Sequence, residues 1–397
     1  MTESLKNHKT ISVHKAYTTC MKLEWSKYWI LSFCAVAVFS CSEEEMPPQE
    51  ENYDLTDIEY DPISVEINYP VYTVQVGPNI PVIPKMPIPE DNQMTEDGVQ
   101  LGRYLFYDNI LSADSTQSCS SCHLPEGSFT DNLAVSVGID GIPGKLSSMS
   151  LLNVGFFDNG LFWNGGSNTL EEQALLPVED IVELHNTWPN VITKLKKHET
   201  YPTMFRKAFG IEKKSEITKE LAAKAISQFE RSIYSFESKF DRYLKGEVLL
   251  EDDELEGFEM FLDLPGASND AHCAHCHAMP LMTSNDYFNN GLQEAATLAD
   301  FDEKGRGLIT GPAQNGFFRA PTLRNIELTG PYMHDGRMST LEEVMDHYIS
   351  GGKPSPNRDS FIPAIDLNPY EKESLIAFLK VLTDTQVISD EKLRSPF

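Results

Sequence analysis

The strongest chemical signal in the chain is a short pattern, Cys-x-x-Cys-His, that occurs twice. The two copies consist of Cys119, Cys122 and His123, and of Cys273, Cys276 and His277. Two cysteines one helical turn apart can bond to the two vinyl groups of one haem, and the adjacent histidine then becomes the proximal ligand of the iron. A zinc site would need further ligands, and a redox dithiol does not need the histidine. The pattern therefore predicts two covalently bound haems of the c type.

The distal coordination position of each haem iron determines the function of that haem. An iron with two axial ligands transfers electrons, and an iron with an open face can bind peroxide. Counted from matching Thr-x-x-Glu motifs at Thr169 and Thr340, Pro177 corresponds to Tyr348. Proline cannot ligate iron and interrupts a helix, whereas a tyrosine phenolate is a haem ligand. We therefore expect an open first haem and a second haem closed by Tyr348, unless Tyr348 only packs in the core. The other candidate ligands are Met345 and His347.

Splitting hydrogen peroxide also requires a group that moves a proton from one oxygen to the other. After its Thr-x-x-Glu motif, the first half offers Gln173, Glu183 and His185. A carboxyl near the iron can act as general acid and base, so we assign this role to Glu183 and the orientation of bound peroxide to Gln173. The alternative is that both are ordinary surface residues.

The elements that must hold these residues repeat within the chain. Residues 101–108 match 256–263, residues 150–154 match 322–326, and residues 163–172 match 334–343. In the last pair, both copies contain the Thr-x-x-Glu capping box that opens a helix. We therefore predict a mainly α fold with two cytochrome c-like domains, formed by internal duplication, each around one haem. His334 corresponds to Trp163 in this repeat, and its role is unassigned.

Helix signals agree with this fold class, and no set of alternating strands is present. Expected helices run from Thr95 as N-cap to Phe106, over 217–244, over 251–262, and from Asn368-Pro369 onward. Capping residues and a proline in the first turn support the first and last of these.

The domain boundaries follow from the repeat and from composition. We place the N-terminal domain at residues 91–245 and the C-terminal domain at residues 246–397. Residues 42–90 are acidic and then rich in proline, which predicts a tether followed by an extended segment lying on the first domain.

Residues 1–41 are typical of a lipoprotein signal peptide. A positively charged region precedes an apolar stretch at residues 28–40, which is too short to span a bilayer comfortably. Cys41 follows a small residue, so we predict that Cys41 is lipidated and anchors the protein on the periplasmic side of the cell envelope. An ordinary signal peptide cut elsewhere is the alternative. Met21 would begin a leader of more usual length.

The composition restricts the partners. The chain has 397 residues and a formal net charge of −28, which disfavours nucleic acid and anionic membrane surfaces. A basic protein partner or simply a solvated acidic surface fits this charge. Of the seven cysteines, four lie in the two motifs and three near the N-terminus, so none remains for a structural disulfide.

Taken together, residues 87–382 resemble the bacterial dihaem cytochrome c peroxidases, a family that includes MauG. Besides the two haem motifs, the resemblance lies in segments 101–106, 162–163, 170–174, 320–325 and 331–336. It implies that the N-terminal haem reduces peroxide and that the C-terminal haem transfers electrons, with Trp163 as a relay between them. It also places Gln173, Pro177 and Glu183 in the distal pocket. A calcium ion between the domains would be held by the carbonyls of Thr329 and Pro331.

Three positions depart from the common family pattern. Ile139 stands where many members carry a distal histidine, so we expect no reductive activation step. Tyr348 replaces the usual methionine ligand, as in MauG, and should lower the potential of the second haem. Ser147 stands in place of a calcium-binding asparagine, which weakens the case for calcium.

Three functions follow from the sequence. The first is a peroxidase that takes electrons from a small cytochrome or similar donor. The second is a MauG-like oxidase that draws electrons from a side chain of a partner protein. The third is a dihaem electron carrier without catalysis, which Pro177 argues against. Contact with a membrane is expected only through the lipid, and a homodimer is left open.

Overall fold

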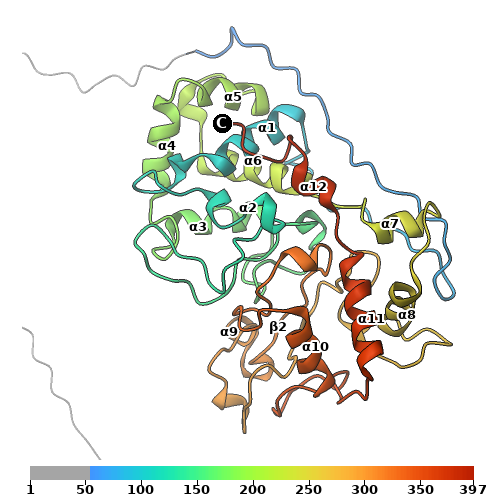
Figure 1. Ribbon diagram of the computed structural model, residues 1–397. Coiled ribbons are helices and arrows are strands. Elements are labelled where there is room, and N and C mark those ends of the chain that lie inside the picture. The colour runs from blue at the N-terminus through green and yellow to red at the C-terminus, as the bar shows by residue number, and fades with distance from the viewer. Residues whose placement is uncertain (1–53) are drawn as a thin grey trace, which may run out of the picture. The chain divides into compact units, whose positions relative to one another are not determined.

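Helices joined by long loops make up the described part of the chain (Figure 1). The computed structural model describes residues 54–397, so the predicted leader and Cys41 lie outside the described residues. The helices are α1 (Glu96–Tyr107), α2 (Leu170–Gln173), α3 (Leu176–Glu179), α4 (Trp188–Lys197), α5 (Tyr201–Phe209), α6 (Lys219–Ser232), α7 (Lys239–Leu244), α8 (Asp252–Phe261), α9 (Gly307–Thr310), α10 (Leu341–Ile349), α11 (Pro369–Lys380) and α12 (Thr385–Ser389). Strands β1 (Tyr287–Phe288) and β2 (Phe318–Arg319) pair antiparallel.

Three of the four expected helices are confirmed, and two of these begin at the predicted caps. The side chain of Thr95 accepts a hydrogen bond from the Gly98 amide and starts α1. Asn368 and Glu371 form a reciprocal capping box at the start of α11. Helix α8 occupies the third expected range.

The expected continuous helix over 217–244 is wrong. Helix α6 ends at Ser232 and α7 begins only at Lys239. Between them, the Ser235 amide donates to Asn153 Oδ1, and the Ser235 hydroxyl donates to Asp384 Oδ2 at 2.7 Å. Serine readily forms such hydrogen bonds in place of helical ones, so partners distant in the sequence pull this stretch out of the helix.

Two helix crossings have the same geometry in the two halves of the described chain. Helix α1 crosses α6 so closely that a Cβ on Gly102 would collide with the carbonyl of Ala225. Helix α8 crosses α11 in the same way, with Gly257 against the carbonyl of Ser374. The matching contacts are what internal duplication predicts, and they explain why glycine stands at the corresponding place in both sequence repeats.

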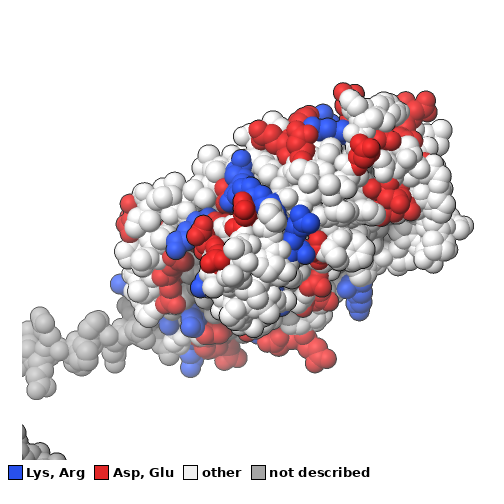
Figure 2. All heavy atoms as spheres, turned by 90° about the horizontal axis from the view of Figure 1, so that it is seen from below, with Lys and Arg blue, Asp and Glu red and all other residues white. Residues whose placement is uncertain are grey.

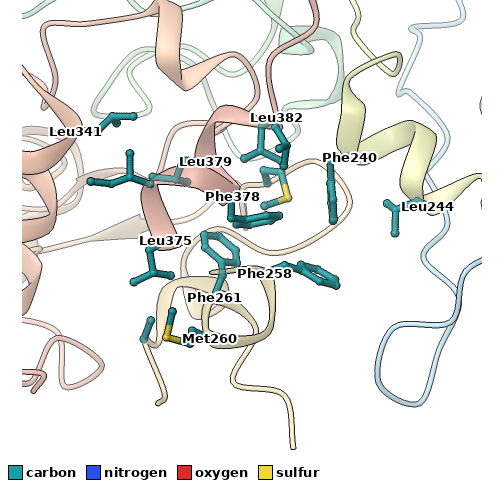
Figure 3. Packing of buried hydrophobic residues seen from close by; sticks show 14 of the residues in the cluster. Phe240, Leu244, Phe258, Met260, Phe261, Leu341, Leu375, Phe378, Leu379 and Leu382 are labelled. Atoms are coloured by element: carbon teal, nitrogen blue, oxygen red, sulfur yellow. The ribbon is translucent and has the colours of Figure 1, made fainter. Parts of the chain in front are cut away.

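The core of the C-terminal half is built from aromatic rings on α7, α8 and α11 (Figure 3). Phe378 lies 5.1 Å from Phe261, 5.2 Å from Phe240 and 5.3 Å from Phe258, measured between ring centroids. Such edge-on and tilted pairs each contribute about 0.5–1.5 kcal/mol beyond burial. The resulting rigid layer supports the wall of the cavity described below.

Residues 54–90 form an extended strap rather than a free tether over their described length, seen as the blue segment of Figure 1. The Leu55 amide donates to the Glu212 carbonyl in the N-terminal half. Further along, the Thr73 amide donates to the Leu244 carbonyl of α7, and the hydroxyl of buried Tyr72 donates to Asp241. The strap therefore contacts both halves, whereas the sequence placed it on the first domain alone.

Charged groups are interspersed on the face shown in Figure 2. Lys and Arg side chains lie beside Asp and Glu side chains, so the negative net charge is not gathered into one acidic face there. No helix among the described residues is long and apolar enough to cross a membrane.

Candidate haem sites

The first Cys-x-x-Cys-His motif presents a histidine that is oriented for metal ligation. The Nδ1 atom of His123 lies 2.9 Å from the carbonyl of Phe129. A carbonyl only accepts, so the proton sits on Nδ1 and leaves Nε2 available as a ligand. Burial lowers the pKa of His123, which favours the neutral imidazole. Cys119 and Cys122 form no disulfide, so both sulfurs can bond to a c-type haem.

The second motif is arranged in the same way. The Nδ1 atom of His277 lies 3.0 Å from the carbonyl of Pro321, and burial lowers the pKa of His277 to about 4. Cys273 and Cys276 likewise form no disulfide. Two thiols one turn apart beside a neutral, oriented imidazole match the chemistry of haem attachment.

An apolar cavity lies against the second motif. Its walls include Cys273, Cys276, His277, Phe261, Met345, Tyr348, Leu375 and Leu379. These residues come from α8, α10, α11 and the motif itself, so the aromatic core described above forms one side of the cavity. A planar, mostly apolar cofactor fits such walls.

Of the three candidate ligands on α10, only two line the cavity. Tyr348 and Met345 both line the cavity. His347 does not, because its Nε2 lies 2.9 Å from the carbonyl of Asn290. Burial raises the pKa of Tyr348 to about 12, so a phenolate there needs a cation such as ferric iron beside it. The assignment of Tyr348 stays a prediction, with Met345 as the remaining alternative.

The predicted helix interruption at Pro177 is confirmed. Helix α2 ends at Gln173, and α3, which carries Pro177, is a separate turn. Helix α10 runs unbroken through the corresponding Tyr348. The Pro177 carbonyl accepts a hydrogen bond from the Leu184 amide, which folds the following chain back on the first half.

That folded-back chain brings Glu183 to the first motif. Burial raises the pKa values of the Cys119 and Cys122 thiols, and the negative charge of Glu183 adds to the shift of both. Glu183 is exposed at the surface of the described chain, yet desolvation by neighbouring atoms, followed by the charge of Asp180, raises its pKa to about 7. Glu183 is therefore a carboxyl that changes protonation state near neutral pH, as a general acid and base should.

The other distal candidates lie differently. Gln173 is half-buried at the end of α2. His185 points outward and pairs through Nδ1 with Asp140 at 2.5 Å, and both side chains are exposed. His185 is thus a surface residue that helps to hold the neighbouring loop.

The loop with Ile139 is attached to the segment that carries Glu183. The Ile139 amide donates to the Glu183 carbonyl at 3.0 Å, and Gly138 packs against the carbonyl of Val182. A Cβ at Gly138 would collide there, so the two backbones lie in close contact. The expectation that no side chain of this loop must swing away before peroxide binds stays a prediction.

Trp163 lies between the two motifs. Its side chain lines the cavity of the second motif, and its indole Nε1 donates to the Ser147 carbonyl at 2.9 Å. The adjacent Ser148 hydroxyl lies 3.3 Å from Nδ1 of His123. Trp163 is thus linked by one hydrogen bond to the chain that contacts the first proximal histidine.

His334, whose role the sequence left unassigned, is a buried histidine beside Trp163. The ring of His334 stacks on Phe318 at 3.5 Å and lies 6.3 Å from Trp163, measured between centroids. Its Nε2 lies 2.7 Å from Glu303 Oε2. Arg337 pairs with Glu303 and neighbouring Asp335, so a cation already balances these acids. The only signal in the sequence is the correspondence of His334 with Trp163.

The side-chain amide of Asn132 binds the segment that is predicted to hold calcium. The Nδ2 atom of Asn132 donates to the carbonyls of Leu328 at 2.7 Å and Gly330 at 2.9 Å. These carbonyls flank Thr329 and Pro331, whose predicted role as calcium ligands stays a prediction.

The fold and the two motifs are those of the dihaem cytochrome c peroxidases, and the chain belongs to this family. Residues 96–248 match the family described as di-haem cytochrome c peroxidase. Over 301 residues the chain is 32% identical to the methylamine utilization protein MauG of Methylorubrum extorquens, covering 75% of this chain and 81% of that protein. It is 33% identical over 315 residues to the cytochrome c551 peroxidase of Nitrosomonas europaea, covering 78% and 85%.

A solved structure agrees with the sequence relatives. It is described as a MauG-like protein associated with microbial copper homeostasis, with 36% identity and a TM-score of 0.72, and the match covers 79% of this chain and 97% of that one. Family membership makes the chain an oxidoreductase with two haem groups.

Proposed function

We propose that the chain reduces hydrogen peroxide to water at its N-terminal haem, with electrons that pass through its C-terminal haem. The observation that carries this proposal is the contrast between Pro177, which offers no ligand at a broken helix, and Tyr348, which lines the cavity of the second motif. Haem supplies the iron that binds peroxide and the two redox centres. Cys119, Cys122, Cys273 and Cys276 would attach the haems, with His123 and His277 as proximal ligands.

Glu183 moves the proton. Reduction of one peroxide consumes two electrons and two protons and yields two waters. Glu183 would take the proton from one oxygen of the peroxide and return it to the other, which would then leave as water. Its pKa of about 7 makes both steps feasible near neutral pH. Gln173, at the end of α2, orients the peroxide through its amide.

Trp163 connects the two centres. Trp163 lines the cavity of the second motif and is hydrogen-bonded to the segment that contacts His123. An indole is among the more easily oxidised side chains, and its large ring shortens the gap that an electron must cross. Trp163 is therefore assigned as the relay rather than as a residue that contacts peroxide.

A second candidate concerns the source of the electrons. An anionic oxygen ligand stabilises ferric iron, so ligation by Tyr348 lowers the potential of the second haem. A low potential makes that haem a poor acceptor from a small cytochrome and favours storage of oxidising equivalents. This favours a MauG-like reaction in which a side chain of a partner protein supplies the electrons. Placement in the periplasm through Cys41 fits both candidates and remains part of the proposal.

An electron paramagnetic resonance spectrum of the fully oxidised protein tests the haem assignment. We expect one high-spin and one low-spin ferric haem without any prior reduction. Two low-spin haems would contradict the open first site. Steady-state turnover of peroxide with reduced cytochrome c then separates the electron sources, because sustained turnover supports the plain peroxidase and its absence supports the partner-protein reaction.

A further inference from the structure

Asn290 holds a defined position beside Tyr348. It follows β1 and lines the cavity of the second motif. Its Nδ2 lies 3.3 Å from the hydroxyl oxygen of Tyr348, and its Oδ1 accepts a hydrogen bond from the Leu292 amide at 3.2 Å. A backbone N–H can only donate, so the side-chain oxygen must face Leu292 and the amide nitrogen must face Tyr348. The direction of the hydrogen bond to Tyr348 follows from this.

The loop that carries Asn290 is held on several sides. The Asn290 carbonyl accepts from Nε2 of His347 at 2.9 Å. The next two carbonyls, those of Gly291 and Leu292, accept from the Lys353 amide at 2.6 Å and from the Arg337 guanidinium at 3.3 Å. The donor is thus positioned before any ligand binds. His347 also anchors Asn290 to α10, the helix on which Tyr348 lies.

We infer that Asn290 is a positioning residue for Tyr348 that sets the potential of the second haem. This inference rests on the proposed function, in which Tyr348 ligates that haem through its phenolate oxygen. A hydrogen-bond donor draws negative charge from a ligating oxygen, which weakens its donation to ferric iron. The potential is then higher than an isolated tyrosine ligand would produce. Asn290 limits how far Tyr348 lowers that potential.

Packing alone is the competing explanation. The same amide nitrogen also contacts Met333 Sδ at 3.5 Å, so Asn290 could simply fill space between Met333 and Tyr348. A packing role predicts lower stability upon truncation but no specific change at one haem. The potential of the second haem therefore distinguishes the two explanations.

The test is a spectroelectrochemical titration of the full-length protein with both haems attached. Asn290→Ala should lower the midpoint potential of the second haem by at least about 59 mV, which is a tenfold change in its one-electron equilibrium constant. The midpoint potential of the first haem should stay unchanged. Met333→Leu is the matched control, because it removes the other partner of the same amide and should leave both potentials unchanged. If Asn290→Ala does not accumulate, the isosteric Asn290→Asp replaces the donor by an acceptor and should shift the potential in the same direction.

A Tyr348→Phe variant separates the possible failures. If its second haem keeps the wild-type low-spin spectrum, Tyr348 is not the ligand, and the roles of Tyr348 and Asn290 are both overturned. If Tyr348→Phe loses the ligand but Asn290→Ala keeps the wild-type potential, only the role of Asn290 is overturned. Equal shifts in Asn290→Ala and Met333→Leu would likewise overturn it and indicate packing.

Discussion

The indole N–H of Trp163 donates a hydrogen bond of 2.9 Å to the main-chain carbonyl of Ser147. A backbone carbonyl accepts this hydrogen bond but is too weak a base to take the proton at ordinary pH, so we expect Trp163 to keep its proton if it gives up an electron. In the proposed relay role, transfer through Trp163 would therefore be electron transfer alone, and its rate should not follow the protonation of any neighbouring base.

Replacement of Trp163 by Phe should slow electron transfer between the haems. Phenylalanine keeps an aromatic ring but removes the N–H group and the more easily oxidised indole. We expect a decrease of at least tenfold, which corresponds to about 1.4 kcal/mol in the barrier. Stopped-flow spectroscopy after mixing reduced protein with peroxide measures it. Trp188→Phe is the control, since buried Trp188 also donates to a carbonyl, that of Leu175, but lies away from the cavity. Equal rates in all three proteins would rule out the relay.

Replacement of Glu183 by Gln should reduce kcat/KM for peroxide by about 10²–10⁴-fold, the range for loss of a general acid and base. The pKa of Glu183 is about 7, and the proton-accepting carboxylate is its deprotonated form. The wild-type rate should therefore rise with pH through about 7, and the variant should lack this rise. Glu179→Gln, on the neighbouring α3 and exposed like Glu183, is the matched control. Unchanged turnover in Glu183→Gln would refute the assignment.

The ion pair between Arg324 and Asp241 should contribute strongly to stability. Both side chains are fully buried, with Nη1 and Oδ2 2.8 Å apart. Burial by itself would raise the pKa of Asp241, but Arg324 outweighs burial and lowers it. Arg324→Met leaves a buried carboxylate unpaired, so the free energy of unfolding should fall by about 3–5 kcal/mol. Chemical denaturation measures this change.

The pH dependence of that stability has a definite sign. Because folding lowers the pKa of Asp241, the stabilisation is complete above the ordinary aspartate pKa of about 3.9 and is lost as pH falls below it. Arg324→Met should lack this acid-sensitive component. Lys224→Met serves as the control, since its partner Asp91 is 76% exposed and its loss should cost only about 0–1 kcal/mol.

Alanine at either helix crossing should destabilise the protein. Alanine favours a helix over glycine by about 1 kcal/mol, but a Cβ at Gly102 or Gly257 would collide with a backbone carbonyl of the facing helix. Overpacking commonly costs about 1–3 kcal/mol, so we expect lower melting temperatures for both variants. Gly144→Ala is the control, because the nearest atom to its Cβ would lie at 3.5 Å. A stabilised Gly102→Ala variant would show that the helices can separate freely.

Features that depend on local chemistry could be predicted from the sequence. The two haem motifs are continuous in the chain, and the starts of α1 and α11 depend on capping side chains a few residues away. The interruption at Pro177 follows from a missing N–H and a ring clash within one turn. The internal repeat predicted the corresponding positions of Pro177 and Tyr348 before any packing was known.

Only the tertiary structure decided which distant residues meet. The break after Ser232 depends on hydrogen bonds from Ser235 to Asn153 and Asp384, which no local pattern reveals. The contact of Asn290 with Tyr348 likewise joins residues that are 58 positions apart. Such contacts depend on how closely helices cross, and that closeness is set by side-chain volume and backbone collision across the interface rather than by any stretch of the sequence alone.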